Sequence, residues 1–299
     1  MSDKPLMFDP DATKYHIGEK IKFVDRLECL AEIELYVRNK CIENRIDYSY
    51  DCTADENTYY ETINYTTYAG MFIMHPLNFS HQLLQMYDAK ADRLDGIGHI
   101  EWIKNNIEHN NISKYVKSDG SDLEKEGLRD FKAVVVLPGS NKIYEHTSDV
   151  KLKKIIERHG SDLVMKPHPI TTEEVLQDLA NVKGEAQLAD PHSNLYEIIR
   201  QADIVYTSHI SETALTSLLL GKRISPMEVF GNGFTGSFSH INHFCFSEPD
   251  PISTLKSVFA SPKSGIIHPD IDKDWKDKVD KYFEYTLSMR KTQIGHYYQ

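Results

Sequence analysis

Strand-like and helix-like segments alternate between Phe131 and Met227, and this alternation is the strongest constraint on the fold. Short runs rich in valine, isoleucine and leucine predict buried strands, and the segments between them repeat apolar residues at helical spacing. Consecutive parallel strands need long crossover connections, usually helices. About five such alternations therefore predict an α/β fold, with a parallel sheet covered by helices on both faces.

Individual segments also carry the signals of helix caps. Ser148 or Asp149 is expected to cap the first helix, and Thr171 with Glu174 forms the pattern of a capping box at the second. The predicted strands are "FKAVVVLPGS", "DLVMK", "EAQLAD", "DIVYTS" and "KRISPM". The predicted helices are "SDVKLKKIIERHG", "TTEEVLQDLANVKG", "SNLYEIIRQA" and "SETALTSLLLG".

The carboxyl ends of the predicted strands carry polar residues, glycine and proline. Ligands of an open parallel sheet bind beyond these ends, so the residues there are the first candidates for a site. They are Pro138, Gly139 and Ser140, then Lys166, Pro167 and His168, then Thr207 and Ser208, and finally Pro226, Met227 and Glu228.

Lys166 and His168 each stand directly before a proline, in "KPHP". A residue before proline is driven into extended backbone geometry, and two extended residues at a separation of two face the same side. The segment therefore predicts a stiff turn that presents an ammonium and an imidazole together. Both groups suit a phosphate. An ordinary loop with a capping histidine is the alternative interpretation.

The segment "YTSHISETALTSLLLGK" places Ser208, Ser211 and Thr213 where a strand gives way to a helix. Free backbone N–H groups and the helix dipole favour an anion at such a position, and hydroxyl groups add donors. Simple capping of the helix by Ser208 or Ser211 explains the same residues without a ligand.

The segments "KPHP" and "ADIVYTSHISETALTSLLLGKRIS" resemble the HP motif and the later Ser/Thr motif of bacterial GT-B glycosyltransferases. The similar enzymes are sialyltransferases and Kdo-transferases of capsule and lipopolysaccharide synthesis, and related glycerophosphotransferases. The resemblance covers about Phe131 to Met227. It implies two Rossmann-like lobes with a nucleotide-sugar in the cleft, and metal-independent catalysis without a cofactor. The donor would be of the UDP, CMP or CDP type.

The same resemblance implies roles for residues of this chain. The family's helix glutamate that holds the ribose is replaced at about that place by Thr216, which leaves Glu212 and Glu228 as candidates for the role. The residues implied to contact the donor phosphates, or to lie in the loop that approaches the donor, are His168, Ser208, Ser211, Thr213, Gly139 and Ser140.

Glycosyl transfer with inversion needs a base near the acceptor hydroxyl, and in similar enzymes it normally comes from the first lobe. Asp95, in "LDGIGHIEW", resembles the acid before glycine that is the base of the sialyltransferase types, although aspartate before a glycine turn is common in loops. His75 is the second candidate. In "SHINHF", Asn242 separates His240 from His243, and without further ligands nearby a zinc site is not expected.

The first half of the chain gives weaker signals. "AGMFIMHP" predicts a strand and "RLECLAEIELYVRNKCIEN" a helix, which suits a second α/β lobe. We expect an acceptor-side lobe over 1–125, a nucleotide-sugar-binding lobe over 126–265, and a helix in 266–299 that packs back on the lobes. The apolar face of that helix comprises Trp275, Val279, Tyr282, Phe283 and Leu287.

Composition narrows the class of protein and its partners. The net charge of −11 opposes binding to nucleic acid or anionic membranes, except through a local basic groove. No apolar run approaches the about 18 residues of a membrane helix, and the first residues do not resemble a signal peptide. A cytoplasmic protein is therefore expected. The four cysteines lack metal-binding spacing and predict reduced structural thiols.

The sequence thus favours a glycosyltransferase that moves a sugar from a nucleotide-sugar to an acceptor hydroxyl. The acceptor could be a surface glycan, or a hydroxymethylated base in phage DNA, in which case the enzyme acts in the host cytoplasm. A sugar-nucleotide 2-epimerase-like isomerase and a non-catalytic nucleotide-binding protein are the alternatives. The oligomeric state stays open.

Overall fold

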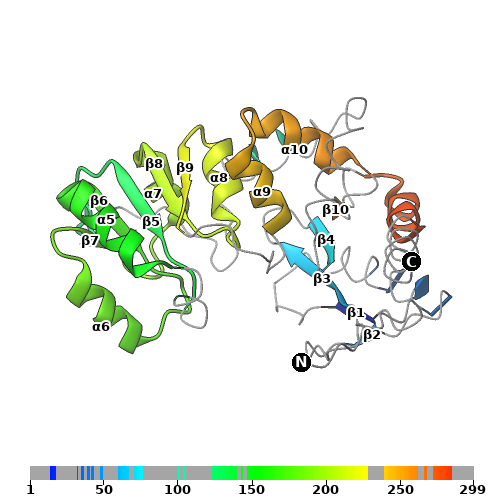
Figure 1. Ribbon diagram of the computed structural model, residues 1–299, viewed down its shortest axis with the longest axis horizontal. Helices are drawn as coiled ribbons and strands as arrows, with labels where there is room; N and C mark the ends of the chain where they lie inside the picture. Colours follow the sequence, from blue (N-terminus) through cyan, green and yellow to red (C-terminus); the bar gives the residue numbers. More distant parts are fainter. Residues whose placement is uncertain are drawn as a thin grey trace, which may run out of the picture. The chain divides into compact units, whose positions relative to one another are not determined.

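The computed structural model divides the chain into two compact units (Figure 1). One comprises Met1–His99, Gly233–Ser237 and Lys256–Gln299, and the other Ile100–Asn232 and Phe238–Leu255. The structure describes residues 14–17, 32, 35–36, 39–40, 42–43, 48–49, 60–66, 71–76, 100–101, 104–105, 123–139, 143, 147–227, 239–261, 266–267 and 272–284.

The second unit contains a five-stranded parallel sheet, as the alternation of segments predicts. Its spatial order is β7-β6-β5-β8-β9. In chain order this is third, second, first, fourth and fifth, which is the order of a doubly wound, Rossmann-like sheet. The order reverses between β5 and β8, so the topological switch point lies at the ends of these two strands. The strands are β5 (Ala133–Val136), β6 (Leu163–Lys166), β7 (Gln187–Leu188), β8 (Ile204–Thr207) and β9 (Arg223–Pro226).

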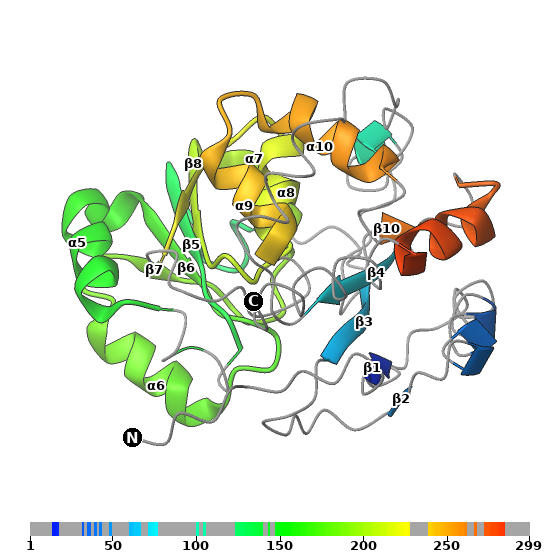
Figure 2. The ribbon, with the colours of Figure 1, turned by 45° about the vertical axis from the view of Figure 1, so that its right-hand side comes forward.

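Helices cover both faces of this sheet, which explains the uninterrupted apolar strands. α5 (Asp149–His159) and α6 (Glu173–Val182) pack on one face, against Ala133 and Val135 (Figure 2). Val134 and Val136 point to the opposite face, together with α7 (Leu195–Gln201). Alternate residues of one strand are thus buried on opposite sides, as a covered parallel sheet requires. α8 (Thr213–Leu219), α9 (Ser239–Ser247) and α10 (Pro251–Ala260) follow along the chain, and α10 crosses the boundary between the two units.

The helix caps agree with the sequence at α5 and differ at α6. Ser148 caps α5 as predicted, because its Oγ accepts a hydrogen bond from the Lys151 N–H (3.3 Å). The predicted capping box of Thr171 and Glu174 is wrong, since α6 has Thr172 at its N-cap and no side-chain hydrogen bond there. Thr171 lies one residue too early, because its N–H is donated to the His168 carbonyl oxygen in the preceding turn (2.9 Å).

Asn194 caps α7, and its removal should be measurable. Its Oδ1 accepts from the N–H groups of Tyr196 (2.9 Å) and Glu197 (3.4 Å). We expect Asn194→Ala to lower the free energy of unfolding by about 1–2 kcal/mol, measured by urea denaturation. Asn194→Asp keeps the acceptor oxygen and should recover most of that loss. An equal loss in both variants would show that the cap is not the cause.

The first unit contains a mixed sheet rather than the all-parallel sheet of a second Rossmann-like lobe. Its order is β10-β4-β3-β1-β2, with β4 antiparallel to both β3 and β10. Only residues 67–70 separate β3 from β4, too few for a parallel crossover, so the two strands form a hairpin. The strand predicted in "AGMFIMHP" is confirmed as β4. The strands are β1 (Lys14–Ile17), β2 (Tyr48–Ser49), β3 (Tyr60–Thr66), β4 (Met71–Pro76) and β10 (Ile266–Ile267).

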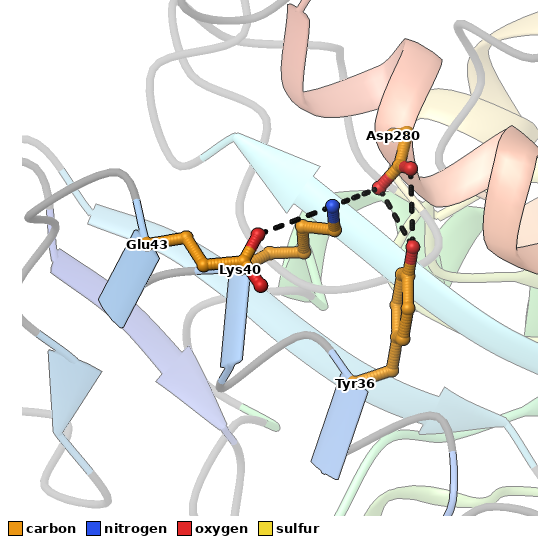
Figure 3. A network of polar contacts seen from close by, with 4 residues as sticks. All are labelled: Tyr36, Lys40, Glu43 and Asp280. Carbon is orange, nitrogen blue, oxygen red and sulfur yellow. Dashed lines mark hydrogen bonds and ion pairs between the residues drawn. The ribbon is translucent and has the colours of Figure 1, made fainter.

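The helical residues 275–284 contact helical positions between 32 and 43 within the first unit. The Tyr36 hydroxyl donates to the Asp280 carboxylate (3.0 and 3.1 Å), and Lys40 Nζ lies 3.1 Å from Asp280 Oδ1 (Figure 3). Burial, followed by the hydrogen bond to Asp280, raises the pKa of Tyr36. The Tyr36 ring also packs edge-on against Trp275, with ring centroids 5.3 Å apart. The predicted apolar face is buried at Trp275, Val279, Tyr282 and Phe283, while Leu287 lies outside the described residues.

None of the helices within the described ranges is both long enough and apolar enough to cross a bilayer.

Candidate functional site

Three of the predicted segments meet at one edge of the second unit's sheet. Gly139 follows β5, His168 follows β6, and Ser208 follows β8. Because the strands are adjacent in the order β6-β5-β8, the loops after them lie side by side at the carboxyl edge. The Leu137 N–H donates to the Lys166 carbonyl oxygen (3.0 Å), which ties the first two segments together. The edge at the switch point is therefore the candidate site.

His168 begins a β-turn that fixes its side chain. Its carbonyl oxygen accepts from the Thr171 N–H (2.9 Å), and Pro169 stands at the second position, where proline favours such a turn. The Ile170 N–H donates to His168 Nδ1 (3.3 Å). With Nδ1 as the acceptor, the neutral imidazole carries its proton on Nε2. The turn thus sets both the orientation and the tautomer of a partly exposed ring.

Lys166 does not present the ammonium that the sequence predicts beside the imidazole. Its Nζ donates to the carbonyl oxygens of Pro167 (2.8 Å) and Pro191 (2.6 Å), and the residue is 3% exposed. Burial lowers the pKa of this lysine to about 8. Because both faces of the sheet are covered, a strand residue points into the interior whichever face it takes. Lys166 therefore ties the end of β6 to the loop after β7.

The hydroxyl groups after β8 shape a turn. Ser208 is fully buried; its Oγ accepts from the Ile210 N–H (3.2 Å) and its carbonyl oxygen from the Ser211 N–H (3.1 Å). Ser211 Oγ accepts from the Thr213 N–H (3.2 Å) and donates to Thr213 Oγ1 (2.9 Å). Glu212 is the N-cap residue of α8 without a side-chain capping bond. Ile210, Ser211 and Glu212 are partly exposed, while Ser208, His209 and Thr213 are buried.

Asn242 of α9 is a site residue to which the sequence alone gives no role beyond separating two histidines. It is fully buried. Its Nδ2 donates to the carbonyl oxygens of His209 and Ser211, the latter at 2.8 Å. The sequence gives no clear signal for it, because five of the nine residues of α9, "SHINHFCFS", are polar. Asn242 joins α9 to the turn after β8.

Buried hydroxyls without a hydrogen-bond partner gather at the same edge. Within the described part of the second unit, one occurs in each loop after β5, β6 and β7, and another at the end of β8. Leaving such a group unsatisfied costs about 1–3 kcal/mol. The hydroxyls at this edge can therefore form further hydrogen bonds with a polar ligand or with water. The residues are Thr147, Thr171, Ser193 and Thr207.

Four predicted residues are not among those that the structure describes at this edge. Ser140, Glu228 and Asp95 lie outside the described residues. His75 lies in β4 of the first unit, paired with Thr62 of β3. Among the residues with described positions, no three His, Cys, Asp or Glu side chains group together as metal ligands would.

Comparison with known proteins gives a distant likeness among solved structures. No protein-family model matches the chain, and no curated protein does. Among solved structures, the chain is similar to the wall teichoic acid polymerase TagF soaked with CDPG, with 11% sequence identity and a TM-score of 0.29. The match covers 100% of this chain and 92% of that one. A TM-score this low carries no inference about the fold or the function of this chain.

Proposed function

We propose that this chain is a glycosyltransferase of the GT-B type whose second unit binds a nucleotide-sugar at the carboxyl edge of its sheet. One observation carries the proposal. The HP turn follows β6 and the Ser/Thr turn follows β8, and these strands flank β5 at the switch point of a Rossmann-like sheet. Nucleotide ligands of such sheets bind in this crevice.

The proposed catalytic role of this edge is to stabilise the nucleotide as it leaves the sugar. His168 donates from Nε2 to a phosphate of the nucleotide-sugar as negative charge develops on it. The Ser211 and Thr213 hydroxyls add hydrogen bonds to this phosphate once the Ser211 proton turns to it from Thr213 Oγ1. Gly139, which is buried after β5, lets the backbone approach the donor. Lys166 holds the edge in shape rather than binding the phosphate. No metal or cofactor is invoked.

The remaining assignments extend this proposal to the whole reaction. Asp95, with His75 as the second candidate, supplies the base that activates the acceptor hydroxyl. Glu212 or Glu228 binds the ribose, and Ser140 joins Gly139 in the donor loop. The acceptor is a surface glycan or a modified DNA base, and the net charge of −11 favours the glycan.

A thermal-shift panel of CMP, CDP, UDP and GDP with their sugars tests the donor site. A ligand present at 100 times its Kd stabilises the folded state by about 2.7 kcal/mol. We expect one nucleotide class to raise the melting temperature by about 5 °C at that concentration. A panel in which no nucleotide shifts the melting temperature would contradict the proposal.

Product analysis then separates the transferase from its alternatives. A transferase should release free nucleotide slowly from its donor, and faster when acceptor is added. A 2-epimerase-like isomerase should give a new sugar-nucleotide without release, and a nucleotide-binding protein should give neither product.

A further inference from the structure

The turn from Ser208 to Ser211 is held from two sides. From within, the Ser208 carbonyl oxygen and Oγ accept from the Ser211 and Ile210 N–H groups. From outside, Asn242 Nδ2 donates to the His209 and Ser211 carbonyl oxygens, using both hydrogens of its amide. Asn242 comes from more than thirty residues away in sequence, so this second constraint is tertiary.

The hydrogen bonds from Asn242 also set the direction of the backbone in the turn. In a trans peptide the C=O and N–H groups point to opposite sides. Drawing the Ser211 carbonyl oxygen toward α9 therefore turns the Glu212 N–H away from α9. The same turn carries Ser211, whose hydroxyl is proposed, with that of Thr213, to bind a phosphate of the ligand. Asn242 thus fixes the backbone from which the Ser211 side chain projects.

We propose that Asn242 is a positioning residue: it fixes the turn from Ser208 to Ser211, and recognition of the donor by that turn depends on it. The identity of the ligand in this inference rests on the proposed function. The effect of Asn242 on the conformation of the turn rests on the observed hydrogen bonds alone.

Packing of α9 does not require an asparagine at this position. Asn242 is 0% exposed and lies between Ile241 and Phe244, which are also buried, so a leucine would suit the packing. Asn242 Oδ1 has no partner among the described residues. A buried amide with one unsatisfied oxygen is unfavourable by itself. The favourable contribution of Asn242 is therefore its two hydrogen bonds to the turn.

Three variants of Asn242 separate positioning from packing. Asn242→Leu keeps the branched shape and the number of side-chain heavy atoms, and it removes both hydrogen bonds. Asn242→Asp is nearly isosteric and, when ionised, has no donor, so it serves if the leucine variant fails to fold. Asn242→Gln retains the amide and should recover part of the function. The matched control is Ser247→Ala on the same helix, which loses only the bond from Ser247 Oγ to the His243 carbonyl oxygen (2.6 Å).

We expect Asn242→Leu and Asn242→Asp to weaken binding of the nucleotide found in the panel by at least about tenfold, each at a temperature where circular dichroism shows it folded. The KM for the donor should rise more than kcat falls. Ser247→Ala should stay within about twofold of the wild type. An unchanged nucleotide Kd in both Asn242 variants overturns the inference.

Hydrogen exchange of the unliganded protein gives a readout that does not depend on the proposed function. The amides of Ile210, Ser211 and Thr213 should exchange at least about tenfold faster in Asn242→Leu, with no change in the strands. Unchanged exchange at these amides overturns the inference. If the wild type binds no nucleotide, the proposed function fails, while faster exchange in the variant still supports the positioning role.

Discussion

Replacing His168 with alanine is expected to reduce donor turnover by about 10²–10³-fold, the usual effect of removing one donor aimed at developing charge. The loss should fall on kcat/KM for the nucleotide-sugar, measured by release of free nucleotide. The fold should persist, because the ring is partly exposed and the turn keeps its bond between the Thr171 N–H and the His168 carbonyl oxygen.

His168→Asn is the matched control for the turn. Asparagine oxygens accept from a backbone N–H two residues on, so the substituted side chain would keep an acceptor for the Ile170 N–H, which His168 Nδ1 now provides (3.3 Å). It does not place a donor where Nε2 lies. We therefore expect His168→Asn to lose turnover as severely as His168→Ala. Recovery of wild-type turnover in His168→Asn would assign the histidine to the turn and remove it from donor binding.

The fold of the second unit could be predicted because its signals are local. Runs such as "AVVV" and "LVMK" are apolar throughout or nearly so, which a strand covered on both faces requires. The first unit is less readable, because β3, "YETINYT", is largely polar and its place in the sheet depends on distant partners. The connection from β3 to β4 comprises only residues 67–70. A short connection predicts a hairpin only when both flanking strands are recognised, and the polar sequence of β3 conceals the first of them.

The candidate site was predictable in its position and less so in its contacts. Extended residues before proline correctly place Lys166 and His168 at the end of a strand. They do not reveal that the Lys166 ammonium finds the Pro191 carbonyl oxygen, 25 residues away in sequence. Asn242 was hidden for the same reason, since its partners come from another loop. Local sequence pattern locates the carboxyl edge of the sheet, and tertiary hydrogen bonds decide which side chains face it.

Lys166 should make stability depend on pH in the alkaline range. Its pKa is lowered by burial from the ordinary 10.5 to about 8 in the folded protein. Between those values the unfolded chain binds more protons than the folded one, so the free energy of unfolding rises as pH increases from about 8 to 10.5. The change corresponds to about 3 kcal/mol at 1.36 kcal/mol per pH unit. The neutral amine still has two N–H donors for its two carbonyl partners, so the fold persists through the titration.

Lys166→Met isolates this contribution, because the other lysines and the tyrosines titrate in both proteins. Urea unfolding of the two proteins at several pH values gives the difference in their free energies of unfolding. We expect that difference to move in favour of the wild type by up to about 3 kcal/mol between pH 8 and 10.5. A difference that stays constant over this interval would mean that the Lys166 ammonium is as well solvated as in the unfolded chain. That outcome would contradict the inward placement of the Lys166 side chain. It would support the exposed ammonium that the sequence predicts.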